Sequence, residues 1–548
     1  MTSTPEAPAG RGTGGDHAAR SVARNAGTVG VATMLSRVLG IVRDQVMAAM
    51  FGAGFASDAF NTAFRIPNLL RDLFAEGAMS ASFIPTFTEY DQNRGADEAW
   101  ALGRQLMMTL LTVLLGLCLV GWAFSPQFMH LLAGGFARYP GKLELTSELF
   151  RIMLPFLPFV ALAAAAMGML NARGVFGIPA LAPALLNVGM IAFGLALIPV
   201  CRRLGQPPIV AMAFCVVLGA LLQFAVQLPA LHKQGFRFRL ELPTWHPGVR
   251  RVAWLMVPAT IGLAATNVNI LVSNNIASRL EQGSVTWLYC AFRLMQLPIG
   301  IFGIALATVS MPALSRAAVR KDMPALKDTL SAAVRLVLLL TVPAAVFLAV
   351  LSQPIISLLF EHGRFHADAV TQTAGALVMY CIGLPFFASI GIFTRTFYAL
   401  GDTRTPMQAS LASVALNVVL NLALVGPLRG LGLAHRGLAL AASMAAAVNL
   451  LQLSLYLRGR IGGFDARRII STLVRVLAAS LAVGALLWLG LHALGGAWHR
   501  GHVRVLGTVL ASAVAAAALG YGALKLARVE ELVLVEDLGR SLGRRFRR

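Results

Sequence analysis

Charged residues are scarce in this chain, and acidic residues are scarcer than basic ones. Only 13% of its 548 residues are charged, whereas 57% are hydrophobic, compared with roughly 45–50% apolar residues in soluble domains. The mean hydropathy is +0.72. So few charges could not cover the hydrophobic core of a soluble fold of this length. The composition therefore excludes an ordinary soluble protein and predicts an integral membrane protein.

Acidic residues number 24 against 46 basic ones, which gives a formal net charge of +22. A nucleic-acid-binding protein would combine such a charge with a basic motif interleaved with aromatic residues, and the sequence has no motif of that kind. Its Lys and Arg residues gather in short loops beside apolar segments, where the positive-inside rule places them. The charge therefore predicts an orientation in a membrane and no nucleic-acid partner.

Motifs for metals, nucleotides and catalysis are also missing. The five cysteines lack the spacing of a zinc site or a disulfide framework, and no GxxxxGK[ST] loop or nucleophile–base pattern occurs. We therefore expect no metal, no cofactor and no enzymatic activity. Residues 1–25 are polar and rich in Gly, Ala and Pro, without the apolar core of a signal peptide, so they predict a disordered tail.

Long apolar runs fill the rest of the chain. A membrane-spanning helix needs about 20 such residues, and fourteen segments qualify: 27–50, 58–88, 102–125, 147–172, 178–200, 208–231, 252–278, 284–314, 328–352, 368–399, 406–426, 433–457, 469–491 and 504–527. The sequence thus predicts an all-α integral membrane protein. An even number of spans places both termini on one side. Basic loops at 233–251, 316–327 and 458–468, together with the tail 528–548, predict that this side is the cytoplasm.

Two parts of the chain repeat one another. The string Ala-Phe-Arg occurs at 63–65 and 291–293, Pro85 corresponds to Pro312, and an Ala-x-Gly-x4-Pro pattern occurs at 172–179 and 399–406. These offsets are 227 or 228 residues, so the chain contains two homologous halves. They predict an N-terminal lobe at 26–232 and a C-terminal lobe at 250–458, each with six helices, followed by two more helices within 469–527. In transporters with parallel repeats, the substrate site lies between the lobes.

Charged residues that could form one cluster come from three of the predicted spans. The first contains Arg37, Arg43 and Asp44, the eighth contains Arg293, and the second contains the following set: Asp58, Arg65, Arg71, Asp72 and Glu76. A charge at a helix centre costs about 2.5–3.5 kcal/mol on insertion scales, and such residues usually mark a substrate or ion pathway. Because guanidinium groups bind phosphate bidentately, these arginines predict a cavity for the phosphate or diphosphate head of a lipid. The alternative is that the charges pair and fix helix packing.

Three stretches of the chain resemble one family. They are SRVLGIVRDQVMAAMFGAGFASDAFNTAFRIPNLLRDLFAEGAMSASFIPTFTEY from Ser36, AFRLMQLPIGIFGIALATVSMPALSR from Ala291 and TRTFYALGDTRTPM from Thr394. They are similar to the MurJ (MviN) family of lipid II flippases in the multidrug/oligosaccharidyl-lipid/polysaccharide exporter superfamily. The resemblance extends along essentially the whole chain. It implies fourteen helices in the bacterial cytoplasmic (inner) membrane, and alternating access that carries lipid II to the outer leaflet.

The resemblance also implies roles for particular residues. Arg37, Arg43 and Arg293 would hold the diphosphate, with Arg71 a further important arginine, and Ser36 and Asn68 would line the cavity. Gating or charge pairing would involve the remaining charged set: Asp44, Asp58, Arg65 and Glu76. The helices within 469–527 would form a groove for the polyprenyl tail. Membrane lipid and cell-wall synthesis or division proteins are the expected partners.

The chain departs from some relatives at two positions. Phe292 stands where some carry an Asp, which leaves Asp44 or Glu76 to pair with Arg293. Ser273 lies near the position of an acid that binds sodium in some relatives, so the sequence does not predict a sodium site. The drive for transport stays open between membrane potential and protons. Two other functions also stay open: another transporter of the superfamily, such as a polysaccharide-lipid flippase or a drug/ion antiporter, and a non-transporting cell-wall scaffold.

Overall fold

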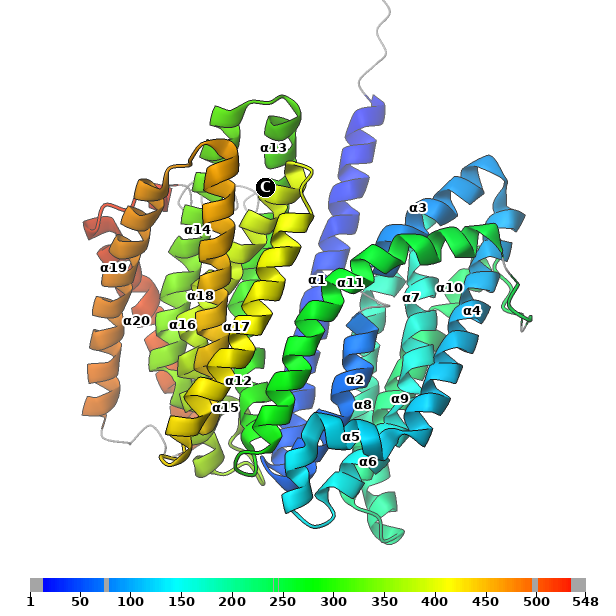
Figure 1. The fold of residues 1–548 in the computed structure, drawn as a ribbon, viewed down its shortest axis with the longest axis horizontal. Helices are drawn as coiled ribbons and strands as arrows, with labels where there is room; N and C mark the ends of the chain where they lie inside the picture. Colours follow the sequence, from blue (N-terminus) through cyan, green and yellow to red (C-terminus); the bar gives the residue numbers. More distant parts are fainter. Residues whose placement is uncertain (1–12, 73–77, 240, 245, 495–500, 534–548) are drawn as a thin grey trace, which may run out of the picture. The chain divides into compact units, whose positions relative to one another are not determined.

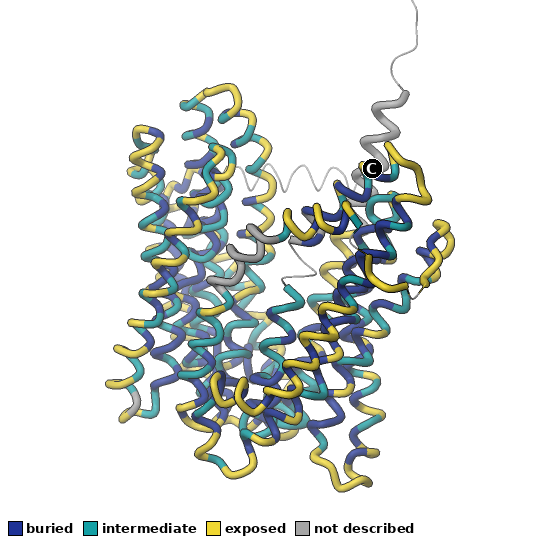
Figure 2. The backbone as a smooth tube through the Cα atoms, turned by 45° about the vertical axis from the view of Figure 1, so that its right-hand side comes forward, coloured by how far each residue is buried: buried dark blue, intermediate teal, exposed yellow. Residues whose placement is uncertain are grey.

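The structure is a computed structural model that describes residues 13–72, 78–239, 241–244, 246–494 and 501–533. All regular elements within these ranges are helices (Figure 1). Eleven of the helices there are long and apolar enough to cross a membrane. The all-α membrane architecture is therefore confirmed, while the count of fourteen spans stays a prediction. Figure 2 shows buried and exposed residues alternating along the same helices, as expected for helices with one face turned inward.

Two compact units divide the chain differently from the predicted lobes. Unit 1 contains residues 1–46, 63–128 and 144–261, and unit 2 contains 47–62, 129–143 and 262–548. Helix α1 (Thr13–Phe51) thus contributes its last turns to unit 2, as does the start of α2 (Phe55–Arg71). Residues 13–25, which the sequence assigns to a disordered tail, form the beginning of α1; residues 1–12 lie outside the described ranges.

Unit 1 is built around α7 (Phe156–Ala172), an almost entirely apolar helix that contacts α3, α4 and α9. Its other helices are α3 (Ala78–Asn93), α4 (Ala96–Ala123), α6 (Lys142–Met153), α8 (Gly177–Arg203), α9 (Pro208–Ala225) and α10 (Leu228–Lys233). Helices α8 and α9 touch at Gly189 and Gly219, where a Cβ on Gly219 would lie 2.8 Å from the Leu186 carbonyl oxygen. Small residues at a membrane helix contact allow this close approach.

Unit 2 has α16 (Ala367–Ala399) at its centre, in contact with α12, α13, α14 and α18 (Figure 1). Its other elements are α5 (Ser125–Ala133), η2 (Gly134–Arg138), α11 (Pro247–Ser278), α12 (Ser284–Pro298), η3 (Ile299–Gly303), α13 (Ile304–Val319), α14 (Met323–Val350), α15 (Ser352–Phe360), α17 (Arg404–Arg429), α18 (Ala434–Ile461), α19 (Ala466–Ala493) and α20 (His502–Leu526). Of these, α5 and α11 begin in unit 1. Elements α12, η3 and α13 form one continuous helix, Ser284–Val319.

Helix bounds repeat with the offset found in the sequence. Helices α4 and α14 begin at 96 and 323 and end at 123 and 350, so both ends differ by 227 residues. Helices α5 and α15 begin at 125 and 352 and end at 133 and 360, with the same difference. Helices α2 and α3 correspond to parts of the continuous helix Ser284–Val319, and residues 73–77 between them lie outside the described ranges. The two halves therefore share a plan.

A turn between α16 and α17 shows how the loops are fixed. The Asp402 carboxylate accepts hydrogen bonds from the backbone N–H groups of Arg404 and Thr405, both at 3.0 Å, and from the Thr405 hydroxyl at 2.7 Å. It also pairs with Arg460 of α18. These bonds to Thr405 are the main reason that the pKa of Asp402 lies below its usual value. The ionised side chain caps the start of α17 and ties it to α18.

Candidate functional site

Arg43 and Asp44, in the last third of α1, pair with each other. Arg43 donates from Nε and Nη2 to Asp44 Oδ1, at 3.0 and 2.7 Å, and from Nη1 to Asn187 Oδ1 of α8 at 3.2 Å. Asn187 in turn donates to the Ser36 carbonyl oxygen at 3.2 Å. Arg43 and Asp44 are 8% and 7% exposed. The pair therefore fixes the guanidinium of Arg43, and Asn187, which the sequence analysis did not single out, connects two turns of α1 to α8.

Arg37 differs from Arg43 because it makes no hydrogen bond or ion pair with the residues that the structure describes. Its side chain is half-buried on α1. Arg71, at the end of α2, pairs with Asp72 at 2.7 Å. Arg65 and Asn68 are half-buried on α2, and Glu76 lies outside the described ranges. Arg37 thus combines a position in a predicted span with a guanidinium that has no hydrogen-bond or ion-pair partner among the described residues.

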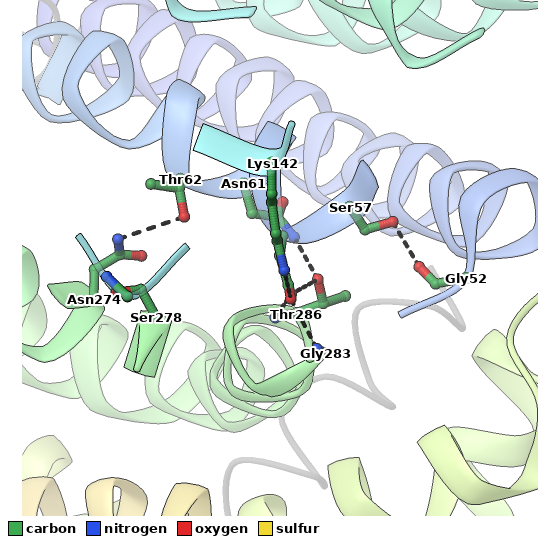
Figure 3. A network of polar contacts seen from close by, with 11 residues as sticks. Gly52, Ser57, Asn61, Thr62, Lys142, Asn274, Ser278, Gly283 and Thr286 are labelled. Atoms are coloured by element: carbon green, nitrogen blue, oxygen red, sulfur yellow. Dashed lines mark hydrogen bonds and ion pairs between the residues drawn. The ribbon is translucent and has the colours of Figure 1, made fainter. Parts of the chain in front are cut away.

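Asp58 is the acceptor at the centre of a buried polar cluster in unit 2, and its partners Lys142, Gly283 and Thr286 are labelled in Figure 3. Its Oδ1 accepts from the Thr286 backbone N–H at 3.0 Å and from the Thr286 hydroxyl at 2.7 Å. Its Oδ2 accepts from the Gly283 N–H at 2.8 Å and from Lys142 Nζ at 2.9 Å. Gly283 and Thr286 form the first turn of α12. The carboxylate of α2 therefore caps a helix that lies 225 residues further along the chain.

Lys142 balances the charge of Asp58 and is itself completely buried, with 0% of its side chain exposed. Its ammonium group lies 4.2 Å from the ring centroid of Phe136, 5.1 Å from that of Tyr139 and 5.8 Å from that of Phe55. Cation–π attraction of this kind is strongest where water is excluded. The sequence analysis missed Lys142, because a single lysine after the Pro-Gly turn at 140–141 has the pattern of an ordinary loop charge.

Two close backbone contacts join further segments of unit 2. The Gly135 N–H donates to the Ser278 hydroxyl at 3.3 Å, and a Cβ on Gly135 would lie 2.4 Å from the Ser278 carbonyl oxygen. The Arg364 N–H donates to the Ala49 carbonyl oxygen at 2.9 Å, and a Cβ on Gly363 would lie 2.2 Å from that oxygen. Only glycine permits these approaches. We call the contacts of Gly135 and Gly363 the glycine seam.

Unit 2 also contains Arg293 and Ser273, the position at which the sequence does not predict a sodium site. Arg293 is half-buried on α12, and the neighbouring Phe292 packs edge-to-face on Tyr380 with ring centroids 5.5 Å apart. Ser273 accepts a hydrogen bond from the Asn421 amide at 3.3 Å, and the same amide donates to Asn417 at 2.9 Å. The side-chain oxygens of Ser273, Asn417 and Asn421 are neutral, and none of these three residues supplies a carboxylate.

Comparison with known proteins decides the family. A family model described as "Lipid II flippase MurJ" matches residues 47–506. The chain belongs to the MurJ family. It is 38% identical to the Burkholderia cenocepacia protein named "Lipid II flippase MurJ", with 79% of this chain and 83% of that protein covered. It is 38% identical to a Vibrio cholerae "Probable lipid II flippase MurJ", with 84% and 87% covered.

Solved structures agree with the MurJ assignment. A structure titled "Lipid II flippase MurJ, inward closed conformation" matches with a TM-score of 0.72 and 25% identity, covering 90% of this chain and 97% of that one. An inward-facing MATE family transporter of the MOP superfamily matches with a TM-score of 0.62 and 16% identity, covering 79% and 94%. The second match shows a shared fold alone. The family expected from the sequence is therefore confirmed.

Proposed function

We propose that this MurJ family member moves lipid II from the inner to the outer leaflet of a bacterial cytoplasmic membrane. The similarity to proteins named lipid II flippases along most of the chain carries this proposal. Both termini would lie in the cytoplasm, as the basic loops predict. The chain would act as a transporter and not as an enzyme, because binding and conformational change suffice to move a lipid head across the membrane.

Arginines of the predicted spans would bind the diphosphate. Arg37 has a guanidinium without a partner among the described residues, which suits it to bind an incoming anion. Arg43 is already fixed by Asp44 and Asn187, so its binding of a phosphate would use an N–H group left over or displace Asp44. Arg293 would supply a further cation from α12. Guanidinium is a suitable ligand because it stays charged when partly desolvated.

The Asp58 cluster would close one end of the transport path. Opening that end would separate the start of α12 from α2, so Asp58 would lose the hydrogen bonds of Gly283 and Thr286. Lys142, the first residue of α6, would remain beside it as the partner that α12 does not supply. The carboxylate would then keep a counter-ion in both states. This arrangement lowers the cost of exposing or reburying an ionised group.

Depletion and rescue in a bacterium test this function. Wild type would restore lipid II on the outer leaflet, whereas Arg37→Ala, Arg43→Ala and Arg293→Ala would not, at equal membrane abundance. Arg203→Ala, in the exposed last turn of α8, is the matched control and would rescue. Failure of abundant wild type would exclude lipid II as the substrate and favour another transporter of the superfamily or a scaffold. Rescue by all three cavity variants would make those arginines structural.

A further inference from the structure

Helices α13 and α16 approach each other through small residues. A Cβ on Gly303, the last residue of η3, would lie 3.1 Å from Ala388 Cβ, and a Cβ on Gly391 would lie 3.8 Å from Ala307 Cβ. These contacts occupy successive turns of both helices. One turn after Gly391 on α16, Arg395 contacts Thr308, the residue that follows Ala307 on α13. The close contact of the two helices thus holds an arginine in a defined position inside predicted spans.

Arg395 has one polar partner among the described residues. Its Nη1 donates to the Thr308 hydroxyl oxygen at 2.9 Å, and that hydroxyl donates its own proton to the Ile304 carbonyl oxygen at 2.7 Å. Thr308 can therefore only accept from the arginine. Arg43, Arg71 and Arg335 each pair with an acid. In the described part of the chain, Arg395 has no such acid, so its remaining N–H groups can bind an anion.

The surface beside Arg395 is apolar. Ile304 and Thr308 are four residues apart on α13 and share one helix face, and Ile301 and Ile304 are about half exposed, at 48% and 51%. Beyond Thr308 the helix ends with Arg316 in its last turn, which the positive-inside rule assigns to the cytoplasmic side. The head group of an inner-leaflet lipid would therefore contact Arg395, and its hydrocarbon chain would contact the two isoleucines.

We propose that Arg395, oriented by Thr308, binds the diphosphate of a polyprenyl lipid before that lipid reaches Arg293. Arg293 and Thr308 lie on one continuous helix, about 22 Å apart along its axis at 1.5 Å per residue. The site would receive the anion at the cytoplasmic end and present it to the deeper arginine. This inference rests on the proposed function, because it assigns one step of substrate capture.

A different role for Arg395 would be to reach the aqueous interface from an apolar helix. An arginine in that role extends its charged group into water. A lysine can substitute for it, because both side chains are long enough to reach the aqueous interface. Here the guanidinium instead donates a hydrogen bond to Thr308 on a neighbouring helix. A planar donor that binds a diphosphate through two N–H groups is not replaced by lysine, which offers a point charge. The substitution Arg395→Lys therefore separates the two roles.

Photo-crosslinking can test the site with the full chain in phosphatidylcholine nanodiscs. The probe is a short prenyl diphosphate with a photoreactive group, and peptide mass analysis measures labelling of the segment 299–319. We expect Arg395→Gln to reduce this labelling about tenfold, as for lost charge-assisted hydrogen bonds, and Arg395→Lys to reduce it about threefold. Thr308→Val, which keeps the side-chain volume, would also reduce it. Arg316→Gln, on the same helix, would leave it unchanged.

Competitors identify the source of the phosphate. Unlabelled farnesyl diphosphate would suppress labelling, whereas phosphatidylglycerol at the same concentration would not. Suppression by phosphatidylglycerol alone, or full labelling of both Arg395→Gln and Thr308→Val, would overturn the proposal. Because labelling does not require transport, these outcomes are separate from the rescue experiment. Wild type that is labelled here and yet fails in rescue would contradict the proposed function and not the binding site.

Discussion

At the scale of single residues, Asp58 and Lys142 illustrate how a charge pair is kept inside the protein. The two oxygens of Asp58 accept four hydrogen bonds, from Lys142, Gly283 and the two donors of Thr286. Burying two charges is expensive, and the cost is offset only where geometry and further hydrogen bonds are good. The aromatic rings around Lys142 supply additional stabilisation. Removing either partner would therefore leave a buried charge uncompensated.

We predict that Lys142→Met lowers stability by about 3 kcal/mol, as for a broken buried ion pair. The ionised Asp58 would then lack a counter-ion, and the apparent melting temperature in detergent would fall. The double variant Asp58→Asn/Lys142→Met would recover part of this loss because it removes both charges. Lys525→Met, at an exposed lysine of α20, is the control. A double variant less stable than Lys142→Met would show that the ion pair is not what these residues contribute.

The sequence could predict some of these residues and not others. Arg37 and Arg43 could be singled out, because a charge within an apolar run is visible from neighbouring residues alone. Lys142 could not, since its partner Asp58 is 84 positions away and nothing local distinguishes it from a loop lysine. Asn187 was missed for the same reason: its contact with Arg43 spans 144 positions. Contacts between distant segments depend on packing, which periodicity and composition do not specify.

At the scale of elements, the repeat could be predicted from the sequence, whereas a π-helical turn in its second half could not. The 227-residue offset in the sequence reappears in the bounds of α4 and α14. The predicted span 58–88 falls on α2 and α3, and its continuity stays a prediction because residues 73–77 lie outside the described ranges. The second-half equivalent is continuous and contains the π-helical turn η3. Such turns often mark functional sites in helices.

Glycines in short connecting elements control how closely those elements approach. We predict that Gly135→Ala weakens the glycine seam, because its Cβ would overlap the Ser278 carbonyl oxygen at 2.4 Å. Overpacking of this kind typically costs about 1–3 kcal/mol. The measurement is maleimide labelling of a thiol introduced by Thr62→Cys, a position with 0% exposure in unit 2. Labelling should become about tenfold faster when Gly135→Ala is added.

The matched control for this prediction is Gly116→Ala in α4, where an added Cβ would meet no atom within 4 Å. It should leave the labelling rate of Thr62→Cys unchanged. If Gly135→Ala labels no faster than the control, the backbone around Ser278 can relax without opening the cluster. The seam would then be a tight contact that does not restrict access to Asp58.

At the scale of the whole molecule, the number of membrane crossings fixes the side on which each loop lies. Eleven helices of the described residues qualify as spans by length and composition, whereas the sequence analysis predicts fourteen. Three predicted segments, 27–50, 58–88 and 252–278, are not among the eleven. The segments 27–50 and 58–88 contain the charged residues of α1 and α2. The segment 252–278 includes residues whose side chains are not described. The topology therefore depends on whether these segments cross the membrane.

We predict that Lys233→Cys and Arg320→Cys both react with maleimide only from the cytoplasmic side, whereas Arg138→Cys reacts from outside. All three positions are exposed, and the five native cysteines are buried, so an impermeant maleimide on intact cells should give little background. Positions 233 and 320 are separated by α11 and by the continuous helix α12–α13. Two crossings return the chain to the same side, and one crossing does not. Opposite labelling of the two positions would therefore mean that α11 does not span the membrane, and a fourteen-helix topology would have to be abandoned.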